Sequence, residues 1–417
     1  MKKLKLVMVG NGMAGVKTLE ELLRTAPGLY DITVFGAELH PNYNRVLLSP
    51  VLAGEQTPDE IVLNPLSWYA EHGITLHLGD TVTAIDRAAR VVHTANGRSA
   101  PYNRLLLATG SRPFVPPVPG HTLTGVMAYR DLADTHAMID AAARHRHAVV
   151  IGGGLLGLEA ANGLLQRGMA VTVVHLGTHL LDRQLDDTAA TLLRQTLEAR
   201  GLRFALGAQT EALLPDAAGR VRAVLLRDGT ELPAELVVMA AGIRPRTELA
   251  EQAGLHCERG IVVNDTLQTV TDPRVYAVGE CAAHRGVAYG LVAPLYEQAQ
   301  VCATHLAQHG VGRYQGSSVS AKLKVTGIDL FSAGDFRGEA GTESIVLHDP
   351  QTGVYKKLVL QGDRLVGACL YGDTEDGSWY FRLLREGHSV GALRDQLMFG
   401  PPATWNEPCM AKEAPAA

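Results

Sequence analysis

The chain has 417 residues, a length that predicts two or three packed units rather than one. Hydrophobic residues make up 46% and charged residues 19%, a balance typical of a soluble globular enzyme with several cores. A formal net charge of −5 and the lack of a basic tract argue against nucleic-acid binding. No apolar run reaches the roughly 18 residues that a membrane-spanning helix needs.

The cysteines and the first residues favour a cytoplasmic protein. Five cysteines are scattered along the chain, and their odd number fits a reducing compartment better than a disulfide framework. An apolar β run already begins at Leu4–Val9, which leaves no room for a signal peptide.

Two stretches that look alike recur about 140 residues apart, which is typical of a duplicated domain. Each has an apolar β run, a glycine cluster, a helical stretch and a second β run. The first copy comprises Leu4–Val9, Gly10–Gly15, Val16–Thr25 and Asp31–Phe35. The second comprises His147–Ile151, Gly152–Gly157, Leu158–Arg167 and Ala170–Val174. Strands that alternate with helices predict an α/β fold with a parallel sheet covered on both faces.

The remaining segments divide the chain further. Arg112–Gly120 holds four prolines in nine positions and is interpreted as an interdomain connector. A second crossing is expected at Gly242–Pro245, after the strand Leu236–Ala240. From about Ser320 the pattern predicts a smaller α+β domain, with β runs and then a helix at Ala321–Val325, Tyr355–Leu360, Arg364–Leu370 and Ser378–Glu386.

The first glycine cluster, Gly10–Gly15, is a G-x-G-x-x-G motif between a predicted strand and a helix. The first glycine permits a tight turn, the second lets the backbone approach a pyrophosphate, and the third lets helix and strand pack closely. An acidic residue for the ribose is expected roughly 20 residues further on, and Glu38 lies at about that distance. This context predicts a dinucleotide site.

The second cluster, Gly152–Gly157, has the same pattern. Its second strand ends at His175, where an NAD site usually has Asp or Glu. Only Arg183 lies nearby for a 2′-phosphate, so we favour NADH over NADPH. The alternative for His175 is a solvent-facing loop residue.

Two later segments, Leu105–Gly110 and Val275–Glu280, are predicted strands. The first ends in Ala-Thr-Gly, and the second ends in glycine followed by a carboxylate. With them the chain resembles the FAD-dependent pyridine-nucleotide oxidoreductases over roughly residues 4–310. In that family an A-T-G strand closes the FAD domain, and a late G-D motif places a carboxylate on FAD; this chain has Glu280 instead of Asp. The resemblance implies FAD at the first cluster and NADH at the second.

Further motifs narrow the resemblance. These motifs are Asn42–Ser49, Val278–Ala282, Tyr289–Pro294, Lys322–Gly327 and Leu397–Gly400. They look like the flavoprotein part of NADH-dependent assimilatory nitrite reductases and like the electron-transfer subunit of assimilatory nitrate reductase.

The resemblance implies a domain plan. The FAD-binding domain is expected at 1–115 and 245–318, and the NAD(P)H-binding domain at 116–244. A C-terminal α+β interface domain is expected at 319–400, followed by a flexible tail at 401–417.

The resemblance also implies residue roles. Arg45 is expected near the flavin, where a cation would stabilise the reduced ring; the alternative is an interdomain ion pair. Glu159 is expected to hold the nicotinamide end; the alternative is a carboxylate that favours the helix dipole. The expected FAD contacts are Gly10, Gly12, Met13, Ala14, Gly15, Glu38, Arg45, Val82, Ala108, Thr109, Gly110, Gly279, Glu280, Val292 and Pro294. The expected NAD(P)H contacts are Gly152, Gly154, Leu155, Leu156, Gly157, Glu159, His175 and Gly242.

Other redox chemistry is disfavoured. No cysteine precedes Cys257, whereas disulfide and peroxide reductases of this superfamily need reactive cysteines early in the chain. Cys281 is expected to be a small buried residue. No cysteine spacing indicates an iron–sulfur cluster, and the histidines, including His145 and His147, form no metal-ligand pattern.

Three hypotheses follow. In the first, electrons pass from NADH through FAD to a partner that carries an iron–sulfur, molybdenum or sirohaem centre, in nitrate or nitrite assimilation. In the second, the acceptor is a small carrier, rubredoxin or ferredoxin. In the third, the chain is an NAD-responsive flavin-bound sensor or scaffold.

Overall fold

A computed structural model describes residues 3–323 and 325–402. They pack as two compact units. The first comprises the described residues up to Arg45, Asp59–Arg112 and Ile243–Ser317; the second comprises Val46–Pro58, Pro113–Gly242 and the described residues from Ser318 onward. Within this part of the chain, no helix is both long enough and apolar enough to cross a membrane. Lys324, Cys409 and most of the predicted tail, residues 403–417, lie outside the described residues.

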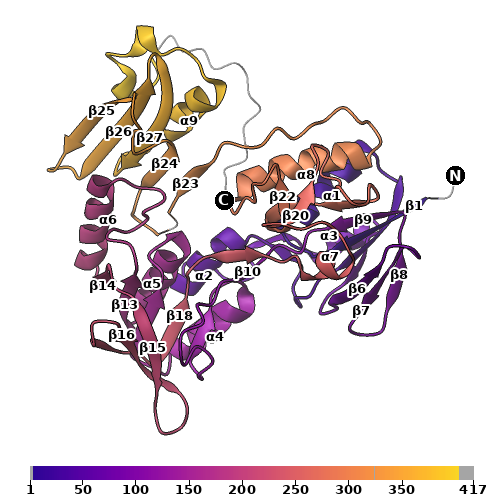
Figure 1. The fold of residues 1–417 in the computed structure, drawn as a ribbon, viewed down its shortest axis with the longest axis horizontal. Coiled ribbons are helices and arrows are strands. Elements are labelled where there is room, and N and C mark those ends of the chain that lie inside the picture. Colours follow the sequence, from indigo (N-terminus) through magenta and orange to yellow (C-terminus); the bar gives the residue numbers. More distant parts are fainter. Residues whose placement is uncertain (1–2, 324, 403–417) are drawn as a thin grey trace. The chain divides into compact units, whose positions relative to one another are not determined.

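The first unit is built on a five-stranded parallel sheet in the order β21-β9-β1-β2-β5. Its central strand β1 buries consecutive residues because helices and loops cover both faces. Helices α1 and α8 lie side by side (Figure 1). The bounds are β1 Leu4–Val9, α1 Met13–Thr25, β2 Tyr30–Phe35, β5 Thr75–His77, β9 Arg104–Leu107, β21 Val275–Ala277 and α8 Val292–Leu306.

Smaller elements complete the first unit. β6 Val82–Asp86, β7 Val91–Thr94 and β8 Ser99–Pro101 form an antiparallel sheet. The others are β3 Asn42–Tyr43, β4 Val62–Asn64, α3 Leu66–Glu71, α7 Glu248–Gln252, β20 Ile261–Val263, the 3₁₀ turn η2 Gly279–Cys281 and β22 Ala282–His284. The chain crosses between the units at β10 Ser111–Pro113 and β19 Ile243–Pro245. It also crosses within the 3₁₀ turn η1, Arg45–Leu47.

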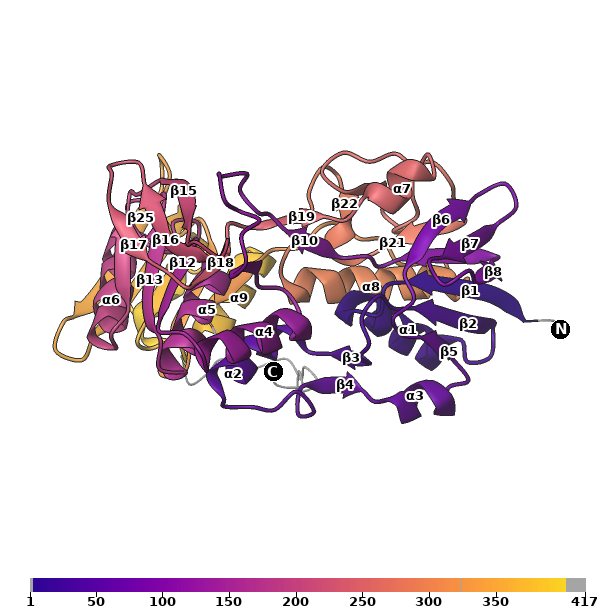
Figure 2. The same ribbon diagram turned by 90° about the horizontal axis from the view of Figure 1, so that it is seen from below.

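The second unit repeats this plan with a parallel sheet in the order β11-β18-β12-β13-β14. An antiparallel meander, β15 to β17, lies beside this sheet (Figure 2), and apolar side chains of the meander and the sheet form one buried cluster. The bounds are β11 Val126–Ala128, α4 Leu132–Ala142, β12 His147–Ile151, α5 Leu155–Gln166, β13 Ala170–His175, α6 Asp187–Ala199, β14 Arg203–Leu206, β15 Thr210–Pro215, β16 Val221–Leu226, β17 Glu231–Pro233 and β18 Leu236–Met239.

The second unit also contains α2 and a C-terminal antiparallel sheet. Helix α2, Leu48–Ala53, packs on α5, and Arg167 donates hydrogen bonds to two of its last carbonyls. The C-terminal sheet has the order β23-β24-β27-β26-β25 and carries α9 on one face (Figure 1). Its bounds are β23 Ser320–Lys322, β24 Leu330–Gly334, β25 Glu343–Asp349, β26 Val354–Gln361, β27 Arg364–Tyr371 and α9 Gly377–Glu386, followed by the 3₁₀ turns η3 Gly391–Leu393 and η4 Leu397–Phe399.

The predicted α/β class with a small α+β domain is confirmed, but some predicted bounds are wrong. Helices α1 and α5 begin three residues earlier than expected, at Met13 and Leu155. The last glycine of each cluster therefore lies in the first turn of its helix. The first predicted C-terminal strand is also shorter, since β23 ends at Lys322.

In each parallel sheet the strand that precedes the glycine cluster, β1 or β12, lies between two neighbours that the chain reaches in opposite directions. From β1 the chain passes to β2 on one side and later to β9 on the other, and β12 has the same relation to β13 and β18. In open parallel sheets, ligands bind outside the carboxyl ends of the strands at such a switch point. Both glycine clusters lie there.

Candidate functional site

The first glycine-rich turn connects β1 to α1 and is shaped by the strand β9. Gly10 has a φ of +101°, and a Cβ there would lie 2.1 Å from the carbonyl oxygen of Ala108. A Cβ at Gly15 would lie 2.8 Å from Ala108 Cβ and 2.9 Å from the Met8 sulfur. Glycine is therefore required at both positions, at the first by the left-handed backbone and at both by lack of space.

The second turn, between β12 and α5, repeats this geometry. Gly152 has a φ of +130°, and a Cβ there would lie 2.2 Å from the carbonyl oxygen of Ala240. A Cβ at Gly157 would lie 2.0 Å from the carbonyl oxygen of Gly152. The end of β18 thus corresponds to the end of β9 in the first unit.

The middle glycines are different, because the space beside them is open. A Cβ at Gly12 or Gly154 would meet nothing within 4 Å. Each is the N-cap of its helix, and within the described residues no side chain caps either helix. The first N–H groups of a helix lack intrahelical partners and form the positive end of its dipole. Both turns therefore fit the pyrophosphate of a dinucleotide.

The acidic residue predicted for the first ribose lies in the loop after β2, in contact with Arg45. Glu38 accepts a hydrogen bond from the Tyr43 hydroxyl at 2.7 Å and forms an ion pair with Arg45. Burial alone would raise the pKa of Glu38, but Arg45 and Tyr43 outweigh it and hold the pKa below its usual value. The Arg45 ion pair lies within the first unit rather than between domains.

The predicted Ala108–Gly110 segment is held by hydrogen bonds with Arg246, which follows β19. The Thr109 hydroxyl donates to the carbonyl oxygen of Arg246 at 2.9 Å. The Arg246 N–H donates to the carbonyl oxygen of Gly110, also at 2.9 Å. Gly110 has a φ of +66°, so this turn too favours glycine.

The predicted Gly279–Glu280 pair lies in η2, beside two residues that the sequence did not indicate. The Gly279 N–H donates to the side-chain oxygen of buried Gln298 at 2.9 Å. The buried Ser111 hydroxyl donates to the Glu280 carboxylate at 2.8 Å. A Cβ at Gly279 would lie 2.9 Å from Ala14 Cβ, so η2 lies against the start of α1.

The remaining residues predicted to contact FAD lie at three helix or strand starts. Met13 and buried Ala14 open α1, and half-buried Val292 and buried Pro294 open α8. Val82 begins β6 and is buried in the core.

His175 is the last residue of β13 and is not a solvent-facing loop residue. Its Nδ1 accepts the Gly153 N–H at 3.2 Å, and its Nε2 lies 3.8 Å from a carboxylate oxygen of Asp182. Burial lowers the pKa of His175, and nearby His179 lowers it further while Asp182 opposes the shift. The imidazole therefore favours its neutral form, with Nδ1 as an acceptor.

Glu159 lies in the second turn of α5 and contacts α2. The Ser49 hydroxyl donates to its carboxylate at 2.8 Å. Half-buried Leu155 and Leu156 form the first turn of α5. Gly242 has a φ of +110°, and its carbonyl oxygen accepts the Phe114 N–H at 2.8 Å.

The described cysteines are Cys257, Cys281, Cys302 and Cys369, and all four are free thiols. Burial raises the pKa of Cys281 and Cys302, which disfavours their thiolates. Across residues 3–323 and 325–402, no group of three or more His, Cys, Asp or Glu could hold a metal ion.

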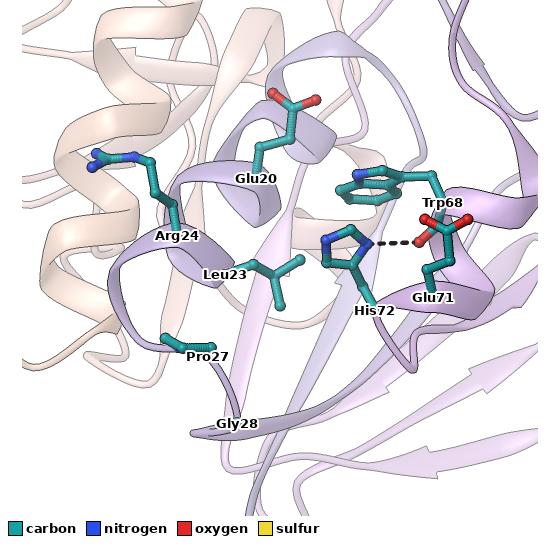
Figure 3. Close-up of a pocket in the computed structure, with 8 residues that line it drawn as sticks. All are labelled: Glu20, Leu23, Arg24, Pro27, Gly28, Trp68, Glu71 and His72. Atoms are coloured by element: carbon teal, nitrogen blue, oxygen red, sulfur yellow. Dashed lines mark hydrogen bonds between the residues drawn. The ribbon is translucent and has the colours of Figure 1, made fainter.

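An open hollow of about 530 Å³ lies near the C-terminal end of α1 (Figure 3), and no residue of either glycine-rich turn lines it. Trp68 of α3 and His72, the residue that follows this helix, line one side, and a nitrogen of the His72 ring hydrogen-bonds with the Trp68 carbonyl oxygen at 2.8 Å. None of the predicted site residues lines it.

Comparison with known proteins identifies the family. Residues 4–308 match the pyridine nucleotide-disulphide oxidoreductase family, and residues 320–388 match the rubredoxin NAD+ reductase C-terminal domain. The chain is 50% identical to a Bacillus subtilis nitrite reductase [NAD(P)H] over 93% of this chain and 48% of that protein. It is 46% identical to the assimilatory nitrate reductase electron transfer subunit of the same organism over 95% of this chain and 51% of that protein. It thus spans about half the length of these relatives.

A solved structure shows the same fold over nearly its whole length. The chain in the crystal structure of the covalent putidaredoxin reductase–putidaredoxin complex has a TM-score of 0.85 and 29% identity, covering 95% of this chain and 97% of that one. The chain belongs to the pyridine nucleotide-disulphide oxidoreductase family, and it is an oxidoreductase that uses a flavin and a nicotinamide dinucleotide.

Proposed function

We propose that the first turn binds FAD, that the second binds NADH, and that electrons leave the flavin for a partner redox protein. The main support for this proposal is the pair of glycine-rich turns. Each unit has one turn with open space beside its middle glycine and, among the described residues, no side chain capping the helix that follows, which is a form that suits a pyrophosphate. We assign FAD to the domain at 1–115 and 245–318, and NADH to the domain at 116–244. The expected compartment is the cytoplasm, where the four described thiols would stay reduced.

Each site has charged groups suited to its ligand. Glu38 is held ionised by Arg45, and an ionised carboxylate is the acceptor that ribose hydroxyls need. Arg45 would also supply positive charge near the flavin. Glu159, oriented by Ser49, would hold the nicotinamide end. When both cofactors are bound, the nicotinamide supplies a hydride and the flavin can release its electrons one at a time.

We propose a nitrate or nitrite reductase catalytic centre as the acceptor, since the two Bacillus subtilis relatives act in that chemistry by name. The acceptor centre would be iron–sulfur, sirohaem or molybdenum. A second candidate is a rubredoxin or ferredoxin, which the match of residues 320–388 to a rubredoxin reductase domain favours.

Because there is open space beside Gly12 and Gly154, substitutions at these two glycines allow a reciprocal test of the two proposed cofactor sites. Gly12→Val and Gly154→Val both have room within the protein and a negative φ, so we expect them to fold, at an N-cap cost of roughly 1 kcal/mol or less. Gly12→Val should purify without FAD yet still bind NAD+ by calorimetry. Gly154→Val should retain FAD but bind NAD+ at least tenfold more weakly. Loss of FAD from Gly154→Val alone would refute the assignment.

The neutral state of His175 predicts a pH dependence. Because burial lowers its pKa below the ordinary 6.5, Nδ1 is still an acceptor at pH 6.5, and the acceptor is lost only as the pH falls through that lowered pKa. The dissociation constant for NAD+ should therefore be constant above about pH 6.5 and rise only in more acidic solution, by up to about tenfold per pH unit. His175→Asn keeps an acceptor that does not titrate, so its profile should be flat. Tighter binding of NAD+ in acid would contradict the prediction.

The electron acceptor can be identified by reoxidation kinetics. Protein reduced with NADH without oxygen is mixed with a nitrite reductase catalytic centre, with rubredoxin or with ferredoxin, and flavin absorption is followed by stopped flow. We expect the first acceptor to reoxidise the flavin at least tenfold faster than either carrier. The reverse order would favour the second candidate, and slow reoxidation by all three would favour a sensor or scaffold.

A further inference from the structure

The segment 176–186, which connects β13 to α6, lies at the nucleotide edge of the second sheet. It follows His175 at the carboxyl end of β13, the edge at which parallel sheets bind ligands. The Leu181 N–H donates to the carbonyl oxygen of Gly153 at 3.1 Å, while the Gly153 N–H bonds His175. The segment is therefore joined directly to the glycine-rich turn.

Leu181 adopts a strained conformation in this segment. Its φ is +51°, in the left-handed region that residues with a Cβ rarely adopt. Its side chain is fully buried, and its carbonyl oxygen accepts the N–H groups of Gln184 and Leu185 at 2.7 and 2.9 Å. Such a conformation persists only where surrounding contacts hold it.

Some of those contacts come from the C-terminal sheet. The Tyr355 hydroxyl donates to Oδ2 of Asp186 at 2.6 Å, and Lys357 Nζ lies 3.4 Å from the same oxygen. Oδ1 of Asp186 meanwhile accepts the Ala189 N–H at 3.0 Å and caps α6. Asp186 and Lys357 are nearly buried, with side chains 14% and 13% exposed, so water screens this cluster little.

A second contact holds the same segment four residues earlier. Arg337, at the end of the turn after β24, donates to the carbonyl oxygen of Asp182. Lys357 donates to the carbonyl oxygen of Arg337 at 2.9 Å, which links the two contacts. The segment is thus anchored at Gly153 on one side and at the C-terminal sheet on the other.

From these contacts we propose that the C-terminal sheet sets the affinity of the second turn for its dinucleotide, with Tyr355 and Lys357 as positioning residues. This inference rests on the proposed function of that turn. Without the Asp186 contacts the segment samples more conformations, and nucleotide binding must then order it at a cost in affinity. The sheet therefore contributes to NADH binding without touching the nucleotide.

Tyr355→Phe tests this proposal, and Tyr371→Phe is its matched control. Tyr371 belongs to the same sheet, and its hydroxyl bonds the Thr196 hydroxyl of α6 at 2.7 Å, well beyond the segment. Each variant removes one hydroxyl between the sheet and α6. Calorimetry on the FAD-loaded protein should show NAD+ binding about fivefold weaker for Tyr355→Phe and within twofold of wild type for Tyr371→Phe. Lys357→Gln combined with Tyr355→Phe should weaken it further.

Thermal midpoints and FAD content separate positioning from general damage. The two tyrosine variants should unfold at similar temperatures and keep their FAD. Equal NAD+ affinities for these two variants would overturn the inference and leave the proposed function intact. Wild-type protein that retains FAD but does not bind NAD+ would overturn the proposed function and the inference together.

Discussion

Both nucleotide turns depend on one close approach between backbone atoms. The carbonyl oxygen of Ala108 lies only 2.1 Å from the position that a Cβ of Gly10 would take, and that of Ala240 lies 2.2 Å from the corresponding position at Gly152. This approach brings the end of one strand against the turn that follows its neighbour. It leaves the first helical N–H groups of α1 and α5 directed outward at the switch point of each sheet. The proposed pyrophosphate sites, and the proposed route of electrons, depend on this constraint.

The two units share this backbone geometry but differ in the side chain that lies at or just after the end of the second strand, β2 or β13. In the first, Glu38 is an ionised carboxylate held by Arg45 and Tyr43. In the second, His175 is a neutral acceptor for a backbone N–H of the turn itself. Histidine at this position therefore stabilises the turn, where a carboxylate would recognise the ribose directly. Anchoring of the segment 176–186 by the C-terminal sheet adds a further support to the second site.

The local patterns could be predicted from the sequence, because a strand, a glycine turn and a helix follow one another within about 30 residues. Contacts between distant segments could not. Ser111 and Glu280 are 169 residues apart, as are Asp186 and Tyr355, and neither pair has a local signal. The strands β24 and β25 were also missed. Leu330–Gly334 is short and ends in glycine, and β25 alternates only partly buried residues with exposed ones.

Transfer of electrons from the second site to the first is the central claim, and an anaerobic titration of the purified protein with NADH tests it most directly. The account predicts that the protein carries FAD and that one equivalent of NADH bleaches the visible flavin absorption. A protein that contains FAD but stays oxidised in excess NADH, or one whose second dinucleotide site also retains FAD, would contradict it.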